Sequence, residues 1–149
     1  MEKIYSKIRT SKLLHLVHRL EDIESLPTEE GLARTNVVPD EEFLQLATLH
    51  MDEGKTFKAH KHIWKTCSNH QANYETIAQE SWIVVKGSVK VIMYDLDDTT
   101  IIKEVLLKAG DCSMTFAGGH NYVIQEDDTI VYEYKTGPYE GIENDKVFI

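Results

Sequence analysis

The chain has 149 residues, of which 42% are apolar, and its 16 Lys+Arg against 25 Asp+Glu give a formal charge of −9. This length and apolar content fit one domain over residues 1–149 with one hydrophobic core, and they exclude disorder throughout. The acidic balance argues against a nucleic-acid partner, and no apolar run approaches the ~18 residues that a membrane-spanning helix needs.

The first 42 residues carry weak signals and are expected to form an irregular N-terminal extension. The start, Met-Glu-Lys-Ile-Tyr-Ser, lacks the apolar segment of a signal peptide, and two cysteines make no disulfide framework. We therefore expect a cytoplasmic protein. Residues Lys12–Leu20 fit either an amphipathic helix or an edge strand, and Ser25–Asp40 is predicted to be a loop because it contains two prolines and a glycine.

From Phe43 onward the sequence predicts one short strand after another. The segments are rich in Val, Ile, Thr and aromatic residues, and Gly, Asp or Asn separates most of them. This spacing, without intervening helical periods, is typical of an all-β sandwich or barrel, with its core over residues 43–134. The tail, 135–149, ends in Lys-Val-Phe-Ile and is expected to dock on the barrel or on a partner. The predicted strands are Phe43–Met51, Thr56–Trp64, Ser81–Gly87, Ser88–Tyr94, Thr100–Leu107, Cys112–Phe116, Asn121–Gln125 and Thr129–Tyr134.

The clearest chemical pattern is a group of histidines with one carboxylate. His60 and His62 are two residues apart, so on a strand they project from the same face. Glu80 stands at the start of an apolar strand, and His120 follows a glycine turn. Three histidines and one carboxylate suit one divalent metal ion, such as Mn, Fe, Ni, Co or Zn.

These residues resemble the two short motifs of the cupin superfamily. The first motif reads Gly, five residues, His-x-His, a gap, Glu, six residues, Gly, and it fits residues from Gly54 to Gly87. The second begins with Gly110-Asp111 and ends at His120. The resemblance implies an antiparallel β-barrel of jelly-roll type, with His60, His62, Glu80 and His120 as metal ligands.

The sequence departs from the cupin pattern at two places. Between His62 and Glu80 lie 17 residues, where the family usually has three or four, and Phe116 stands in the proline position of the second motif. The long segment, 63–79, is expected to form a loop over the barrel mouth. It carries His70, which is either an exposed loop residue or a lid residue that reaches the site.

Several other side chains are candidates for contact with a substrate. Four lysines around the histidine pair form a basic patch, either a solvated strand edge or an attraction for an anionic substrate, and Lys58 faces the same way as His60. Trp82 is either a core residue or a stacking wall for a sugar ring, and Tyr122 is a further lining candidate. For proton transfer the candidates are Tyr132, Tyr134 and His70.

The overall pattern resembles small single-domain cupins encoded among bacterial surface-polysaccharide genes. That resemblance implies an isomerase or epimerase acting on a sugar or sugar nucleotide, with the metal as a Lewis acid, or a metal-free ketoisomerase that uses His60 and His62 as acid and base. The alternatives are an Fe(II)-dependent dioxygenase and a non-catalytic module that binds a sugar or a metal. Small cupins commonly pair through edge strands, so we expect a homodimer.

Overall fold

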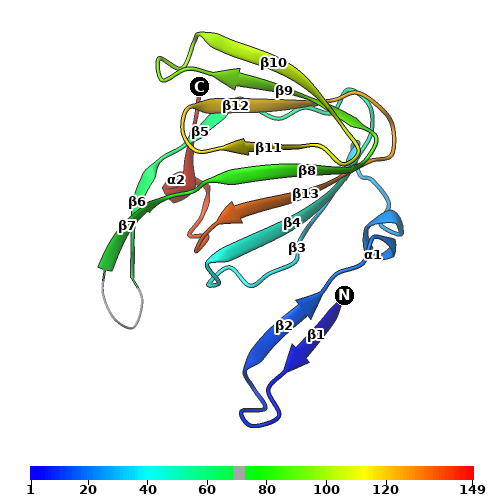
Figure 1. Ribbon diagram of the computed structural model, residues 1–149, viewed down its shortest axis with the longest axis vertical. Helices are drawn as coiled ribbons and strands as arrows, with labels where there is room; N and C mark the ends of the chain where they lie inside the picture. Colours follow the sequence, from blue (N-terminus) through cyan, green and yellow to red (C-terminus); the bar gives the residue numbers. More distant parts are fainter. Residues whose placement is uncertain (69–72) are drawn as a thin grey trace.

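Two antiparallel five-stranded sheets face each other in the computed structural model, which describes residues 1–68 and 73–149 (Figure 1). Each sheet combines strands that are distant in sequence, as in a jelly roll. One has the order β10 (Ile101–Lys108), β9 (Ser88–Tyr94), β12 (Gly119–Ile124), β5 (His60–His62) and β14 (Lys146–Phe148). The other has the order β11 (Cys112–Thr115), β8 (Glu80–Lys86), β13 (Thr129–Thr136), β4 (Leu44–Met51) and β3 (Leu32–Asn36). The predicted all-β barrel is therefore confirmed.

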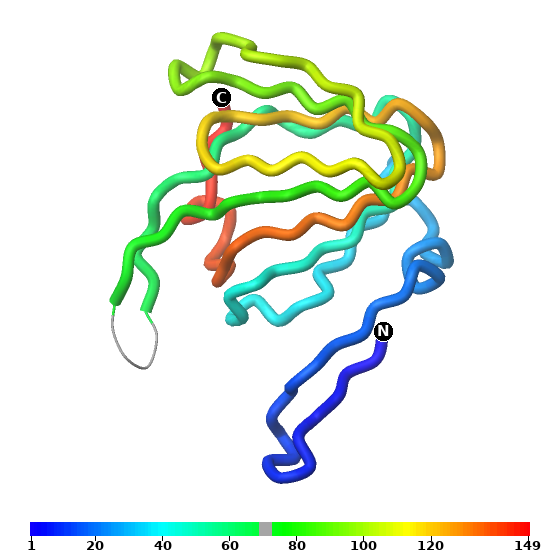
Figure 2. The backbone as a smooth tube through the Cα atoms, in the orientation of Figure 1, coloured from blue at the N-terminus to red at the C-terminus, as the bar shows by residue number. Residues whose placement is uncertain are grey.

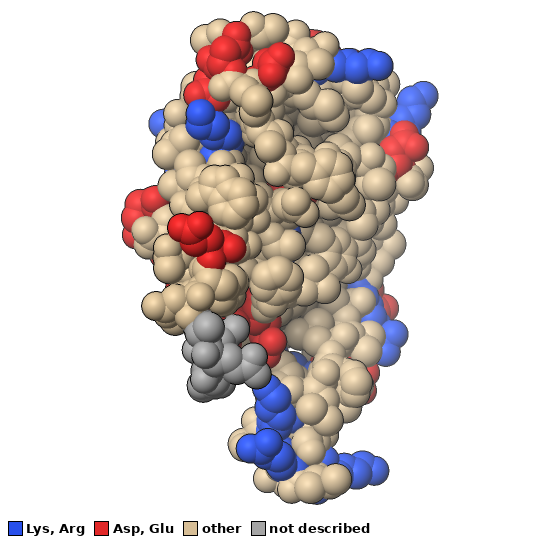
Figure 3. Space-filling view, turned by 60° about the vertical axis from the view of Figure 1, so that its left-hand side comes forward, with Lys and Arg blue, Asp and Glu red and all other residues tan. Residues whose placement is uncertain are grey.

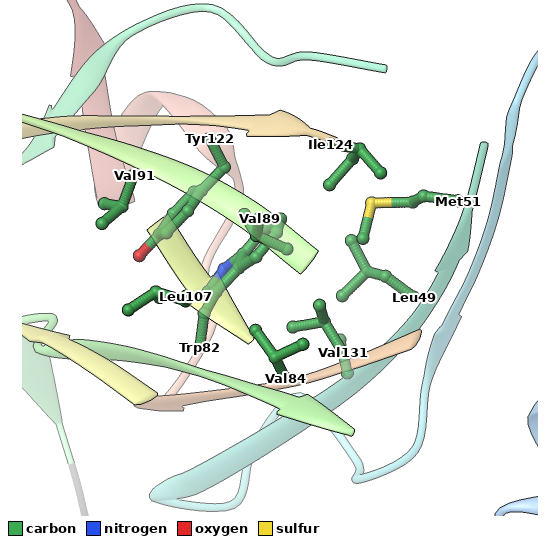
Figure 4. Packing of buried hydrophobic residues seen from close by; sticks show 11 residues of the cluster. Leu49, Met51, Trp82, Val84, Val89, Val91, Leu107, Tyr122, Ile124 and Val131 are labelled. Atoms are coloured by element: carbon green, nitrogen blue, oxygen red, sulfur yellow. The ribbon is translucent and has the colours of Figure 1, made fainter. Parts of the chain in front are cut away.

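The core lies between the inner faces of the two sheets. In Figure 4, Trp82 from β8 and Tyr122 from β12 lie against each other, and valines from both sheets surround them. Their rings are stacked, with centroids 3.8 Å apart and planes 4° apart. This packing joins the two sheets at the centre of the barrel. The remaining buried members of the cluster are Ala47, Leu49, Met51, Val84, Val89, Val91, Leu107, Ile124 and Val131.

The N-terminal extension is more regular than the sequence predicted. Strands β1 (Glu2–Tyr5) and β2 (Leu13–Val17) form a hairpin that projects from the barrel, and helix α1 (Glu21–Glu24) follows it (Figure 1). The predicted loop Ser25–Asp40 contains β3, which pairs with β4 at the edge of a sheet. Its sequence, Leu-Ala-Arg-Thr-Asn, did not predict a strand because an edge strand needs no apolar run.

The expected loop over residues 63–79 contains a two-stranded hairpin, formed by β6 (Trp64–Ser68) and β7 (Asn73–Ile77). His70 lies outside the described residues. The single strand predicted over Thr56–Trp64 is limited to β5, preceded by one isolated bridge between Thr56 and Val123.

The C-terminal tail docks on its own barrel. Helix α2 (Ile142–Asp145) leads into β14, which pairs with β5 and so extends the first sheet. Figure 2 shows this red segment running from the end of β13 up to the opposite sheet. The two sheets thus include β3 and β14, on either side of the predicted core at 43–134.

Charge is distributed unevenly over the surface. In Figure 3 lysines and arginines gather at the tip of the β1–β2 hairpin, acidic residues lie at the opposite end, and uncharged residues fill much of the face between them.

Both helices among the described residues are only four residues long, so neither can span a bilayer.

Candidate metal centre

Four side chains from three strands meet inside the barrel. His60 and His62 project to the same side of β5, as the alternation along a strand requires. Antiparallel pairing of β12 with β5 places His120 opposite His60. Glu80 comes from β8 in the facing sheet. The structure therefore brings together the four residues that the sequence predicted as metal ligands, and all four are buried.

The ligand atoms of the four cluster residues lie close to one another. Each residue offers one ligand atom, and these four atoms lie within 4.8 Å of one another. The His120 Nε2 atom is 3.1 Å from Glu80 Oε1, and His62 Nε2 is 3.3 Å from Glu80 Oε2. The ring centroids of His60 and His120 are 4.5 Å apart. A single divalent ion could bind all four side chains at once.

The hydrogen bonding of His60 and His62 also fits a metal. Among the described residues, the buried Nε2 atoms of His60 and His62 have no hydrogen-bond partner, although Glu80 Oε2 lies 3.3 Å from His62 Nε2. The opposite nitrogens are engaged: His60 Nδ1 lies 3.0 Å from the Lys58 carbonyl, and His62 Nδ1 lies 3.2 Å from the Asp145 carbonyl. Acceptors at Nδ1 leave the Nε2 lone pairs for a metal.

The protein environment separates the pKa values of the cluster. Burial, together with the neighbouring His120, lowers the pKa of His60 to about 4. Burial acts in the same direction on His62, but the carboxylates of Asp145 and Glu80 outweigh it and raise its pKa to about 9. For Glu80, burial is outweighed by the two neighbouring histidines, the hydrogen-bonded His120 and the nearby His62, which hold its pKa well below the usual range. A neutral His60 and an ionised Glu80 are the forms that coordinate a cation.

A cavity of about 540 Å³ lies beside this cluster, between the two sheets. His60 and Glu80 line it, so the cluster is accessible from the cavity. The predicted substrate-contact residues Lys58, Trp82 and Tyr122 line it too.

Among the charged residues that line the cavity, basic side chains predominate. The cavity is lined by Arg34, Lys55, Lys58, Lys135 and Lys146, against Asp40, Glu80 and Glu133. Arg34 binds Glu133 through two hydrogen bonds of 3.0 and 2.7 Å. Among the described residues, Lys58 and Lys146 form no ion pair with a carboxylate, although Lys58 lies 5.5 Å from the Phe148 ring centroid. These two lysines leave positive charge available in an acidic protein.

The structure does not bring Tyr132 and Tyr134 to the cluster. Both alternate along β13 with Val131 and Glu133, which point inward, so the tyrosines face outward. They line a separate hollow with His18 and Leu46 at the base of the β1–β2 hairpin. The predicted proton-transfer role of these tyrosines therefore lacks support from their position.

Sequence reasoning missed two parts of the site. Arg34 lies on the unpredicted strand β3, and Asp145 lies 83 residues from the histidine that it contacts. Neither residue belongs to a local motif, so only the pairing of distant strands could reveal them.

No protein-family model and no curated protein matches this sequence. Solved structures do match its fold. KdgF from Halomonas sp. is 18% identical, with a TM-score of 0.56, over 82% of this chain and 94% of that one. A cupin superfamily protein from Desulfitobacterium hafniense is 8% identical, with a TM-score of 0.52, over 74% and 82% of the two chains.

A third match is the capsular polysaccharide assembling protein CapF from Staphylococcus aureus. It is 16% identical, with a TM-score of 0.63, over 83% of this chain. This chain spans only 31% of the length of CapF, so the similarity concerns one part of that protein. Together these matches show that the chain has the cupin fold. Within that fold it has a buried group of three histidines and one glutamate that could hold a metal ion.

Proposed function

We propose that the protein is a metal-dependent enzyme that isomerises or epimerises an anionic sugar or sugar nucleotide. One observation carries this proposal: the buried cluster of His60, His62, Glu80 and His120 lies beside a large cavity whose charged lining residues are mostly basic. The fold similarity to a capsular polysaccharide assembling protein supports a role in polysaccharide biosynthesis.

The cluster would hold one divalent ion, which supplies Lewis-acid polarisation of carbonyl and hydroxyl oxygens. Lys58 and Lys146 would attract the negative charge of a phosphate or carboxylate group. The stacked Trp82 and Tyr122 present apolar ring surface to the cavity. Burial raises the pKa of Tyr122, and its hydroxyl lies 3.2 Å from Ser113 Oγ, so Tyr122 stays protonated and fixed.

Proton transfer requires a group in the cavity wall. Tyr139 lines the cavity, and its hydroxyl has no hydrogen-bond partner among the described residues. Glu133 is less suited because Arg34 binds both of its oxygens. We assign the transfer to Tyr139 within this proposal, and Tyr139→Phe should lower kcat while the metal content stays unchanged.

Metal content is the first test. Elemental analysis of protein purified without added metal should give one equivalent, which His60→Ala and His62→Ala should both remove. His15→Ala is the matched control, because His15 is exposed on the β1–β2 hairpin, and it should keep the metal. Unchanged stoichiometry in both cluster variants would overturn the proposal.

Turnover is the second test. The protein is incubated in D₂O with a panel of sugar phosphates and nucleotide sugars, and proton NMR follows exchange at carbon. An isomerase or epimerase that moves a proton should introduce deuterium into one substrate, and the cluster variants should not. Bound iron with substrate-dependent oxygen consumption would instead indicate a dioxygenase. Sugar binding without exchange would indicate a binding module.

A further inference from the structure

Asp145 is a buried carboxylate that the proposed chemistry does not use. It is the last residue of α2 and is only 1% exposed. Three cationic or polar side chains surround it. Its Oδ1 atom is 3.0 Å from Lys65 Nζ, its Oδ2 atom is 2.9 Å from Lys135 Nζ, and Oδ2 is also 3.4 Å from His62 Nδ1. A buried charge with this many partners has a defined position.

The contacts of Asp145 fix the orientation of the His62 ring. On one side of the ring, Nδ1 lies 3.2 Å from the Asp145 carbonyl oxygen and 3.4 Å from its carboxylate. Both of these groups only accept hydrogen bonds, so Nδ1 carries a proton. On the other side, Nε2 lies 3.3 Å from Glu80 Oε2, inside the cluster. The ring is thus held with Nε2 directed at the site where a metal would bind.

The segment that carries Asp145 also holds the backbone of β5. Lys146 and Phe148 are the register partners of His62 and His60. Beyond the strand, Ile63 N donates to the Asp145 carbonyl at 3.2 Å, and Ile149 N donates to the Ala59 carbonyl at 3.0 Å. Backbone hydrogen bonds therefore secure both ends of the three-residue strand that provides two of the four cluster residues.

Lys65 and Lys135 connect Asp145 to the β6–β7 hairpin and to the opposite sheet. Lys65 comes from β6, has a side chain that is 4% exposed, and also donates to the Pro138 carbonyl at 2.7 Å. Lys135 comes from β13 in the opposite sheet. The two lysines therefore restrain the Asp145 carboxylate from two directions while it contacts His62.

We propose that Asp145 is a positioning residue for the metal centre, and that residues 141–149, through their backbone hydrogen bonds, hold β5 in place for metal binding. The inference rests on the proposed function in requiring that the cluster binds a metal. Carboxylates that orient a histidine ligand typically change metal affinity ten- to a hundredfold when they are lost. The sequence on its own gives no indication of this role, since Asp145 belongs to neither histidine motif.

The test compares metal affinity among variants of the full chain. Metal-stripped protein is titrated with Zn²⁺ and with Co²⁺ against a chromophoric chelator, and near-UV circular dichroism checks the fold. Asp145→Asn keeps the size of the side chain and removes its charge, and it should raise the Kd of both metals about ten- to a hundredfold. Asp128→Asn is the matched control. It removes a carboxylate that lies 3.1 Å from a histidine outside the cluster, His50, so its Kd should stay within about threefold of wild type.

Asp145→Asn leaves two lysines without their carboxylate and could fail to fold. The double variant Asp145→Asn/Lys65→Met removes the more buried of these lysines, and it should show the same loss of affinity. His60→Ala reports separately on the cluster itself. A wild-type Kd in a folded Asp145 variant, together with lost binding in His60→Ala, would overturn only the positioning role. Absence of metal binding in wild-type protein would overturn both proposals.

Discussion

Trp82 offers the sharpest test of how the core and the cavity are combined. This side chain is 2% exposed, it stacks on Tyr122, and it makes an edge contact with Phe57 at a centroid distance of 5.6 Å. It also lines the cavity beside the cluster. The sequence left two roles open, a core residue or a stacking wall, and the structure places Trp82 where it serves the core and faces the cavity.

Replacement of Trp82 by alanine should remove a large part of the total stability. Truncating a buried tryptophan costs about 3–5 kcal/mol through lost transfer energy and the resulting void. The stacked pair adds roughly 1 kcal/mol beyond the buried area. A domain of this size has a free energy of unfolding of about 5–15 kcal/mol, so Trp82→Ala should remove at least about a quarter of it. Trp82→Phe keeps an aromatic ring against Tyr122 and should cost roughly 1–2 kcal/mol.

The second tryptophan of the chain provides the control. Trp64 lies on the β6–β7 hairpin and is 69% exposed, so Trp64→Ala should change the free energy of unfolding by about 0.5 kcal/mol or less. Urea unfolding followed by far-UV circular dichroism measures all three variants. Similar losses for Trp82→Ala and Trp64→Ala would refute the assignment of Trp82 to the core.

Four further predictions concern metal, pH, backbone and assembly. Refilling metal-stripped protein at a hundred times the Kd should add about 2.7 kcal/mol to the free energy of unfolding, and His60→Ala should abolish that gain in a thermal-shift assay. Without metal, the stability contributed by His62 is complete below pH 6.5 and is lost as the pH rises to about 9, because the folded pKa exceeds the unfolded one. Because the folded pKa of His60 is about 4, the free energy of unfolding should also fall as the pH drops from 6.5 to 4. A free energy of unfolding that stays constant from pH 4 to 9 in urea titrations would contradict both shifts. Gly87→Ala places a Cβ against Thr129 at a positive φ and should cost more than Gly54→Ala, which has a similar φ but open space, in paired urea titrations. The expected homodimer should appear as twice the chain mass in light scattering, and a monomer would contradict it.

The strands of the barrel could be predicted where turn residues delimit them. Strand β9 has the predicted bounds, Ser88–Tyr94, because Gly87 at φ +77° and the turn from Asp95 define its two ends. Strand β4 differs from its prediction by one residue for a similar reason. Strand β3 was missed because its few polar residues are stabilised by pairing with β4 and not by a pattern of their own.

The candidate metal cluster could be predicted because its members stand in short sequence motifs. His60 and His62 share a face through the period of two along a strand, and the spacing from Glu80 to Gly87 reproduces a short motif. His120 sits on β12, directly after the glycine turn that the motif requires. The resemblance to the two cupin motifs then joined these separate stretches into one predicted ligand set.

The sequence by itself therefore determined most strands of the barrel between residues 43 and 134 and, with the cupin resemblance, the identity of the four cluster residues. The tertiary structure decided which face of β13 points inward, and so placed Tyr132 and Tyr134 outside the cavity. It also decided that Arg34 and Asp145 approach the site from opposite ends of the chain. The physical reason is that strand alternation is a local property, whereas the pairing of β3 with β4 and of β14 with β5 depends on contacts between segments far apart in sequence.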